Sequence, residues 1–212
     1  MRLFIAEKPS VAKAIAAELG NVTRAEGYLQ CGADRVTWCF GHILEMAKPE
    51  HYGEQYAKWR AEDLPIIPQV WALLPKEDAK AQLAVIGRLL KDTTEVVNAG
   101  DPDREGQLLV DEVLEHFKNR RDVKRFWVSA QDSVSIQRGL AALKSNKDYQ
   151  GLKDAALARQ RADWLIGMNF SRAYTLRAQR GGAQKTVLTV GRVQTPTLAL
   201  VVARDREIEA FK

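Results

Sequence analysis

The feature that most constrains the fold is the alternation of short apolar runs with amphipathic segments in the first part of the chain. The run "RLFIA" at residues 2–6 is followed at once by "KPSVAKAIAAELG", and "EVVNA" at 95–99 precedes another amphipathic stretch. Short continuous apolar runs suit strands buried on both faces, and apolar residues four apart suit helices. The alternation predicts an α/β fold, a largely parallel sheet with helices on both faces.

Turn residues and periodicity locate the other expected elements of this part. They predict a helix from Pro9 to Gly20, a hairpin made by "GYLQC" and "RVTWC", a helix near 77–91, a helix from Gln107 and a strand at "KRFWV". Between residues 48 and 76 four prolines and two tryptophans predict an ordered excursion with little regular structure.

The pattern of the sequence changes near residue 151, where the alternation of strand and helix signals ends. A long helical run with no strand signal extends to Gly181 and Gly182, and Pro196 indicates the start of another helix. We therefore predict a catalytic domain over residues 1–150 and a smaller, mostly helical segment over 151–212. The second segment holds eleven Lys and Arg against five Asp and Glu, while the first is close to neutral. This asymmetry predicts a polyanion-binding surface beside a metal-using core.

Three carboxylates spaced two apart, Asp101, Asp103 and Glu105, follow the strand at 95–99, and Glu7 follows the first strand. Ligands of open α/β sheets sit at the carboxyl ends of the strands, so these acids converge if the two strands are neighbours. Oxygen ligands without His or Cys suit Mg²⁺, with Mn²⁺ as a substitute. The two cysteines form no CxxC pair, so no zinc site is expected and buried free thiols are.

The alternative is that the acidic run caps a helix and complements its dipole. That explanation accounts well for Glu105. It accounts less well for Asp101 and Asp103, since two acids are more than a cap requires. It also leaves unexplained why a second strand end carries Glu7 and Lys8 together.

Four motifs in this order resemble a known family. They are "IAEKPSVAKAIA", "WCFGHILE", "AGDPDREGQLL" and "GRVQTPTL", and they resemble the N-terminal part of type IA DNA topoisomerases, with bacterial topoisomerase III enzymes nearest in pattern. The resemblance implies that the first three motifs belong to a TOPRIM domain, a Rossmann-like α/β fold. It implies that the fourth motif, with the long basic helix, starts a DNA-binding domain.

The resemblance also implies an activity and a site. Enzymes of this family break and rejoin single DNA strands through a tyrosyl phosphodiester with Mg²⁺, relaxing negative supercoils and decatenating DNA. The family's acidic metal site would correspond to Glu7, Asp101, Asp103 and Glu105, and Lys8 would match the lysine that positions the scissile phosphate. The catalytic set expected on this basis is Glu7, Lys8, Asp103 and Glu105.

The resemblance further implies single-stranded DNA as a partner, with a RecQ-type helicase and a single-strand-binding protein as associates. The N-terminus has no signal-peptide pattern and no apolar run reaches about 18 residues, so we expect a cytoplasmic, nucleoid-associated protein with no membrane partner.

One departure from the family pattern concerns the nucleophile. The family's tyrosine lies in a motif resembling "TYPR", which this chain does not contain, and its five tyrosines stand in other contexts. The chain reads as a piece of a longer enzyme. We expect it to bind metal and DNA weakly and to relax no supercoils by itself.

Candidate DNA contacts fall in three places. On the long helix, a stripe mixes cations and an indole at helical spacing, namely Arg161, Trp164, Met168, Arg172 and Gln179. The alternative is that Trp164 and Met168 are core and the arginines extend along its edge.

The other two places are a loop and the excursion. In "TVGRVQ" the candidates are Thr189, Gly191, Arg192 and Gln194, which match a family segment that lines the single-stranded DNA groove; an ordinary helix-initiating loop is the alternative. Trp59 stands between two cations, and packing against the prolines of the excursion explains it equally well.

Three other function classes remain open at this point. The acidic cluster also suits a TOPRIM nuclease or primase, although primases of that type usually bring a zinc-binding segment. A phospho-acceptor receiver domain normally places an acidic pair after its first strand, whereas Glu7 stands there with Lys8. A non-catalytic module that binds single-stranded DNA is the third class.

Overall fold

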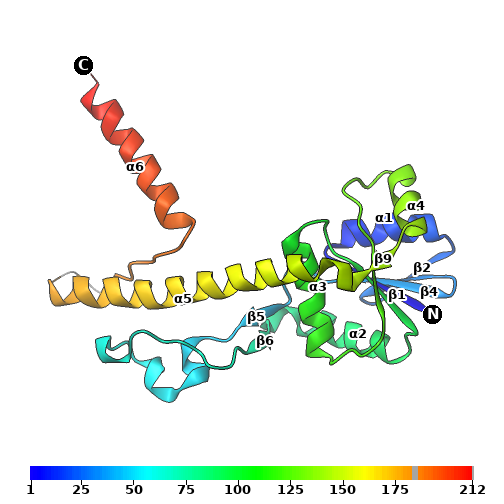
Figure 1. Ribbon diagram of the computed structural model, residues 1–212, viewed down its shortest axis with the longest axis horizontal. Helices are drawn as coiled ribbons and strands as arrows, with labels where there is room; N and C mark the ends of the chain where they lie inside the picture. Colours follow the sequence, from blue (N-terminus) through cyan, green and yellow to red (C-terminus); the bar gives the residue numbers. More distant parts are fainter. Residues whose placement is uncertain (183–185, 212) are drawn as a thin grey trace. The chain divides into compact units, whose positions relative to one another are not determined.

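The structure is a computed structural model that describes residues 1–182 and 186–211 (Figure 1). It divides into two compact units. Unit 1 comprises Met1–Glu45 and Leu73–Leu157, and unit 2 comprises Met46–Ala72 and Ala158–Lys212. The Pro-rich excursion is thus grouped with the second half of the chain, whereas the boundary predicted near residue 150 grouped it with the first.

Unit 1 is built on a seven-stranded sheet of order β2-β3-β4-β1-β7-β8-β9. The strands are β1 (Arg2–Ala6), β2 (Val22–Ala25), β3 (Tyr28–Cys31), β4 (Asp34–Trp38), β7 (Glu95–Ala99), β8 (Val123–Arg125) and β9 (Lys144–Ser145). The four central strands, β4, β1, β7 and β8, are parallel, and the outer pairings are antiparallel. In this register Ala6 lies opposite Ala99, so the carboxyl ends of β1 and β7 meet.

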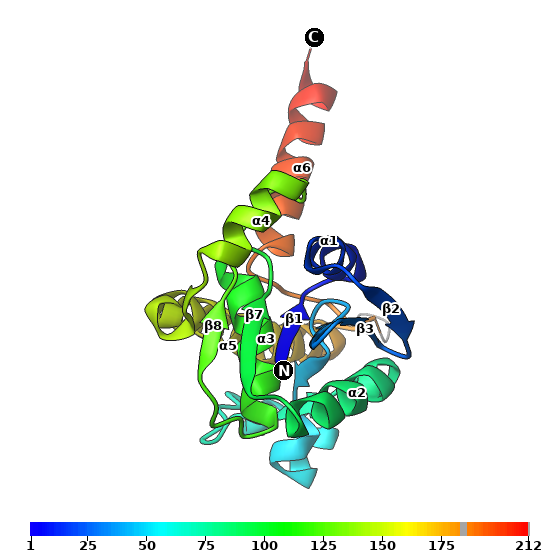
Figure 2. The ribbon, with the colours of Figure 1, turned by 90° about the vertical axis from the view of Figure 1, so that its right-hand side faces the viewer.

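Helices cover both faces of the sheet, as Figure 2 shows. The helices α2 (Lys80–Lys91) and α3 (Arg104–His116) pack on one face around Leu3 and Ile5, and α1 (Pro9–Leu19) and α4 (Ser133–Ala141) pack on the other around Phe4 and Ala6. Successive β1 residues therefore serve opposite cores, which explains why the run is apolar throughout. The predicted α/β class is confirmed.

Several boundaries differ from those expected. The helix predicted from Gln107 begins at Arg104, because the Asp103 carboxylate caps it and accepts a hydrogen bond from the Gly106 N–H at 2.7 Å. The strand predicted over 124–128 ends at Arg125. The strand β2 and the helix α4 were not predicted. Both cysteines are free and buried, as expected, and burial raises the pKa of the Cys39 thiol well above its usual range.

Unit 2 contains most of one long helix, a second helix and the excursion. The helix α5 (Gln150–Arg180) begins in unit 1 and continues through unit 2, and α6 (Gln194–Ala210) follows. The short elements are η1 (Pro49–Tyr52), η2 (Glu54–Ala57) and η3 (Ala61–Asp63) in the excursion, β5 (Leu44–Met46) and β6 (Leu73–Pro75) at its two ends, and η4 (Glu77–Ala79) and η5 (Asn146–Tyr149) in unit 1.

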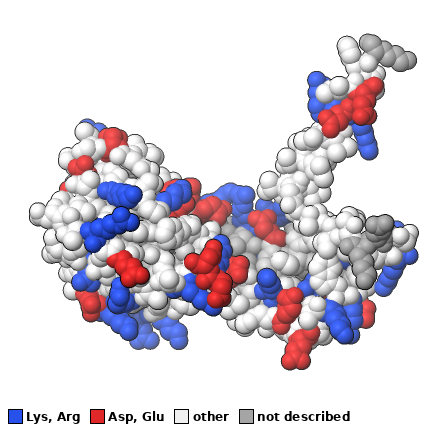
Figure 3. All heavy atoms as spheres, turned by 180° about the vertical axis from the view of Figure 1, so that it is seen from behind, with Lys and Arg blue, Asp and Glu red and all other residues white. Residues whose placement is uncertain are grey.

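The two helices of unit 2 differ in how they are packed. The inner face of α5 is buried within its unit, whereas α6 is exposed along its length. Figure 3 shows charged side chains gathered near the end of α6 and an uncharged stretch before them. Among the described residues, no helix is both long and apolar enough to cross a membrane.

Candidate metal centre and nucleic-acid interface

The pairing of β1 with β7 brings the first two predicted acids together. Glu7 directly follows β1 and Asp101 lies two residues past β7. The Asp101 N–H donates to Glu7 Oε2 at 3.3 Å. Residues 94 apart in the chain thus meet at one edge of the sheet, where the strand-end geometry of α/β folds places ligands.

The positive group that the structure places between these two acids is the ammonium of Lys8. Its Nζ lies 2.7 Å from Asp101 Oδ2 and 3.3 Å from Glu7 Oε1. The hydrogen bond to Asp101, followed by the charge of Glu7, raises the pKa of Lys8. Lys8 therefore offsets one of the negative charges of the cluster, and its carboxylate partners hold it charged.

The two remaining acids of the predicted cluster, Asp103 and Glu105, lie at the start of α3 and have other partners. Asp103 uses one carboxylate oxygen to cap α3, so the capping explanation holds for Asp103, not for Asp101. Glu105 is about half exposed on the first turn of α3, with its Oε1 3.7 Å from Arg104 Nε. In the part of the chain that the structure describes, no three His, Cys, Asp or Glu side chains are arranged around a common metal position.

The donor set that does converge fits Mg²⁺. Glu7 and Asp101 supply carboxylate oxygens, and Mg²⁺ in phosphate-handling sites is bound by one or two carboxylates together with water and phosphate. Asp103 has a second carboxylate oxygen that its cap to the Gly106 N–H does not use. The residues present thus agree with a magnesium site of few protein ligands.

Two glycines allow the loop between β7 and α3 to close so tightly. A Cβ on Gly100 would lie 2.1 Å from the carbonyl oxygen of Gly106, and a Cβ on Gly106 would lie 2.4 Å from that of Asp101. No side chain fits in either place. Close approach of backbone to backbone therefore fixes the path of the loop that carries Asp101 and Asp103.

Arg125, which ends β8, is a site residue that sequence reasoning missed. It is fully buried, and its guanidinium donates to the carbonyl oxygens of Gly100 and Asp101, each at 2.7 Å. Burial lowers its pKa to about 10, so it remains charged at neutral pH. The only signal in the sequence was one arginine in the otherwise apolar run "RFWV".

His42 pairs with an acid of α3 that is not in the predicted set. Its Nδ1 lies 3.3 Å from Oε2 of the buried Glu112 on α3, and this hydrogen bond raises the pKa of His42. The pairing gives His42 a partner within unit 1.

Trp164, in the predicted stripe on α5, is packed inside unit 2. Its side chain is buried, and its Nε1–H donates to the Ala47 carbonyl at 2.9 Å. The rings of Tyr52 and Trp71 meet it edge to face at 5.7 and 5.4 Å. Trp164 therefore belongs to the core that holds the excursion against α5, as the alternative for this residue stated.

Arg172 is also buried in unit 2. It donates to the Tyr56 carbonyl at 2.8 Å and lies over the ring of Trp59 at 5.2 Å, and burial lowers its pKa. Arg161 lies over Trp71 in the same way, at 5.5 Å. Met168 is half-buried and Gln179 is exposed. Within the stripe, Trp164 and Arg172 are therefore packing residues, and Gln179 lies at the surface.

The loop before α6 folds back onto α5. The Val190 N–H donates to the Ser171 hydroxyl at 2.8 Å, and the Gly191 N–H donates to the Thr195 hydroxyl at 3.0 Å. Arg192 is exposed, with its Nε 3.1 Å from Asp163 of α5. These contacts fix the loop while leaving the Arg192 side chain at the surface.

Most of the predicted DNA contacts line two grooves of unit 2. One groove is lined by five of them, Trp59, Met168, Arg172, Thr189 and Gln194. Gln194 also lines the second groove, with Gly191, Arg192 and the paired Asp163. The structure therefore gathers residues from the excursion, α5 and the loop into one surface, although it leaves Arg161, Trp164 and Gln179 outside both grooves.

Comparison with known proteins gives a consistent assignment. The Toprim domain family matches residues 2–131, and the DNA topoisomerase family matches residues 147–212. DNA topoisomerase 3 of Vibrio cholerae is 52% identical over 99% of this chain, that of Pasteurella multocida 50% over 100%, and that of Bacillus subtilis 41% over 99%. The chain spans 33% of the length of the first two and 28% of the third.

Among solved structures, full-length topoisomerase I from Thermotoga maritima has the same fold. The similarity covers 99% of this chain and 31% of that one, with a TM-score of 0.63 and 22% identity. The two family matches and the relatives, which align with nearly all of the chain, agree with the resemblance of the four motifs to the N-terminal part of type IA DNA topoisomerases. Since the Toprim match alone takes in more than half of the chain, the chain belongs to the Toprim domain family.

Proposed function

We propose that this chain supplies the metal-binding and part of the DNA-binding machinery of an enzyme that breaks and rejoins single DNA strands. The observation that carries the proposal is the meeting of Glu7 and Asp101 at adjacent parallel strand ends with the Lys8 ammonium between them. Two carboxylates and a mobile cation at one point are what phosphoryl transfer requires: a place for Mg²⁺ and a charge for the phosphate.

In this proposal the metal ligands are drawn from Glu7, Asp101, Asp103 and Glu105. Bound Mg²⁺ would supply charge stabilisation to the phosphate oxygens. Lys8 is hydrogen-bonded to the carboxylate of Asp101. Neutralisation of that carboxylate would weaken this bond, so the ammonium would become available to hold the scissile phosphate. Lys8 would thus change partner as the site fills.

The bond exchange proposed is a tyrosyl phosphate step that conserves a phosphodiester. A tyrosine hydroxyl displaces one DNA oxygen from phosphorus, and the released DNA hydroxyl later attacks the tyrosyl phosphate to restore the strand. The relatives are about three times as long as this chain, and we place the tyrosine in the part of the enzyme that corresponds to their remaining length. Relaxation and decatenation, in the cytoplasm at the nucleoid, would be activities of that longer enzyme.

Single-stranded DNA is the proposed occupant of the two grooves of unit 2. Arg192 and Thr189 would contact phosphates, Gln194 a base edge, and Trp59 a base face. Gly191 would allow close approach of the backbone. Arg172 and Trp164 act through packing, since both are buried and hold the excursion that carries Trp59. Arg161 and Gln179 lie on the same helix and would extend the contact, and a helicase and a single-strand-binding protein remain proposed partners.

The function is tested by transplanting the chain. A chimera in which this chain replaces the corresponding residues of the Vibrio cholerae enzyme is expected to relax negatively supercoiled plasmid with Mg²⁺ and not with EDTA. The 212-residue chain alone is expected to relax none. Failure of a folded chimera to relax DNA, or relaxation by the chain alone, would contradict the assignment. Shortened single strands after incubation of the chain with Mn²⁺ would favour the nuclease alternative instead.

DNA binding by the chain alone should depend on the exposed loop cation. Replacing Arg192 with Ala is expected to weaken binding of a fluorescent single-stranded oligonucleotide and to reduce the steepness of its salt dependence by about 0.7, the share of one phosphate contact on a single strand. Arg88→Ala removes an exposed arginine on α2 of unit 1 and serves as the matched control. Equal losses in the two variants would show that only net charge matters.

A further inference from the structure

We propose that Arg125 is a positioning residue for the acidic cluster, its guanidinium fixing the main chain that presents Asp101 to the metal. The inference rests on the proposed Mg²⁺ function and adds to it a residue that the four motifs do not contain. Arg125 touches neither Glu7 nor the carboxylate of Asp101 in the bonds described. Its action is through the backbone of the loop between β7 and α3.

The hydrogen bonds of Arg125 converge on that loop. Nη1 donates to the carbonyl oxygens of Gly100 at 2.7 Å and Asn98 at 3.2 Å, and Nη2 donates to that of Asp101 at 2.7 Å. A further Nη1 bond goes to the Phe126 carbonyl, and Nε donates to Gln107 Oε1, both at 2.7 Å. Three carbonyls at the end of β7 are therefore oriented by one planar group.

These bonds hold the loop because losing them would remove hydrogen-bond donors from main-chain carbonyls at the end of β7. Main-chain carbonyls at the end of a buried strand need hydrogen-bond donors, and an unsatisfied buried acceptor is costly. The guanidinium donates to the Gly100 carbonyl, and it adds a second donor to the carbonyls of Asn98 and Asp101, which also accept from the N–H groups of Phe126 and Asp103. Its planar fork fixes the angle between the three carbonyls. A lysine at this position would keep the charge but could not reproduce that fork.

A second layer of polar groups fixes the guanidinium itself. Gln107, which accepts from Arg125, donates to the Asp111 carboxylate at 2.8 Å, and Asn146 donates to the same carboxylate at 2.8 Å. The Trp127 ring lies over the guanidinium at 4.7 Å, and the Tyr149 ring stacks on Trp127 at 4.8 Å. The arginine is thus held in one orientation by residues of α3 and η5 and by Trp127, which follows β8.

Positioning and simple electrostatics predict opposite results at this residue. A positive charge beneath carboxylates weakens their attraction for Mg²⁺, so a purely electrostatic arginine would oppose metal binding, and its removal would tighten it. A positioning arginine supports binding, and its replacement weakens it. Arg125→Lys separates the two, because it keeps the charge and removes the fork.

The test is a titration of the 212-residue chain with Mg²⁺ alone, followed by calorimetry and by the amide resonances of Gly100, Asp101 and Gly106. Arg125→Lys is expected to weaken Mg²⁺ binding by about 10-fold or more, as loss of an outer-shell partner does at metal sites, and to shift those three amide resonances before metal is added. The matched control is Arg2→Lys at the other end of β1. It replaces a guanidinium whose Nε and Nη2 both donate to the Asp34 carboxylate. The control is expected to keep the affinity and the three resonances.

The outcomes separate the inference from the function on which it rests. If the unaltered chain binds no Mg²⁺, the proposed function fails. If it binds Mg²⁺ and folded Arg125→Lys binds equally well or more tightly, positioning by Arg125 is wrong. Should Arg125→Lys fail to fold, Trp127→Ala, which removes only the half-exposed ring over the guanidinium, must weaken Mg²⁺ binding and move the same resonances. Unchanged binding and resonances in that variant would overturn the inference.

Discussion

Replacing Glu7 with Gln is expected to lower the Mg²⁺ affinity of the chain by at least about tenfold and to abolish relaxation by the chimera. Loss of an outer-shell partner already costs 10- to 100-fold at metal sites, and Glu7 is proposed as a direct ligand. The substitution keeps the size of the side chain and its ability to accept from the Asp101 N–H, so it removes charge and little else. Calorimetric titration with Mg²⁺ and a plasmid relaxation assay measure the two effects.

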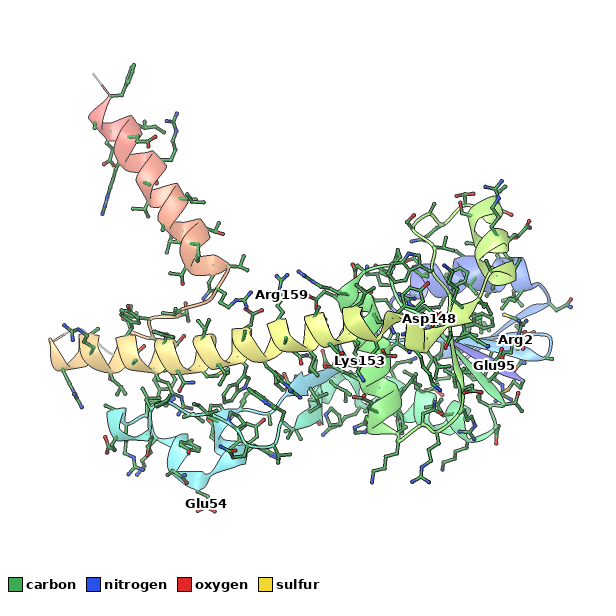
Figure 4. The ribbon with its side chains drawn as sticks, viewed as in Figure 1. Arg2, Glu54, Glu95, Asp148, Lys153 and Arg159 are labelled. Atoms are coloured by element: carbon green, nitrogen blue, oxygen red, sulfur yellow. The ribbon has the colours of Figure 1, made fainter. Side chains whose placement is uncertain are left out.

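The control for this variant is Glu95→Gln. Glu95 begins β7, beside Arg2 at the opposite end of the same pair of strands, as Figure 4 shows. The change in net charge is identical and the acidic cluster is left intact. We expect Mg²⁺ affinity and relaxation to be retained. Loss of affinity in both variants would mean that the ion responds to overall charge and has no built site.

Replacing Trp164 with Ala is expected to destabilise unit 2 by about 3–5 kcal/mol, the usual cost of removing a buried aromatic side chain. The variant loses a buried ring, its edge-to-face contacts with Tyr52 and Trp71, and a hydrogen bond to the Ala47 carbonyl. Hydrogen exchange followed by mass spectrometry should show lost protection in residues 46–72 and in α5 from residue 158. The strands of unit 1 should keep theirs.

The matched control is Phe170→Ala on the same helix. The Phe170 ring is about half exposed, so its removal should cost far less than that of Trp164. Single-stranded DNA binding should fall in the Trp164 variant and not in the control, since only the former releases the segment that carries Trp59. Equal protection in both variants would show that the excursion is held by other contacts.

What the sequence predicted well were features that depend on local pattern or on one topological rule. The apolar runs at 2–6 and 95–99 are strands with those bounds, because both faces of each are buried. The sequence left the adjacency of these two strands as a condition, which the pairing of β1 with β7 meets. Given that pairing, the rule that ligands gather at the carboxyl ends of parallel strands predicts that Glu7 and Asp101 lie close together. Two of the four motifs that indicated the family, "IAEKPSVAKAIA" and "AGDPDREGQLL", lie at these same strand ends.

What the sequence did not predict depends on contacts between distant segments. Arg125 in an apolar run carries no signal that its partners are carbonyls of another strand's end. Trp164 and Arg172 were expected at a DNA surface because periodicity shows which residues share a face and not what covers that face. The excursion over 46–72 covers it, through contacts such as the bond from Arg172 to Tyr56 across 116 positions. The amphipathic pattern is the same for a face buried by protein and one that meets DNA.

The acidic cluster brings a lysine and a predicted metal site together. Mg²⁺ is predicted where Glu7 and Asp101 converge, and in the structure the Lys8 ammonium lies between these two acids. A metal ion would share these carboxylates with Lys8, and we propose that Lys8 changes partner when the ion binds. This exchange is the step on which the proposed phosphate chemistry depends.

Anomalous scattering from crystals of this chain grown with Mn²⁺ tests that step most directly. We predict one ion bound by the carboxylate of Glu7 and by that of Asp101 or Asp103, with the Lys8 ammonium no longer hydrogen-bonded to Asp101. A fully occupied ion elsewhere on the protein, with Lys8 still between the two acids, would contradict the proposed site.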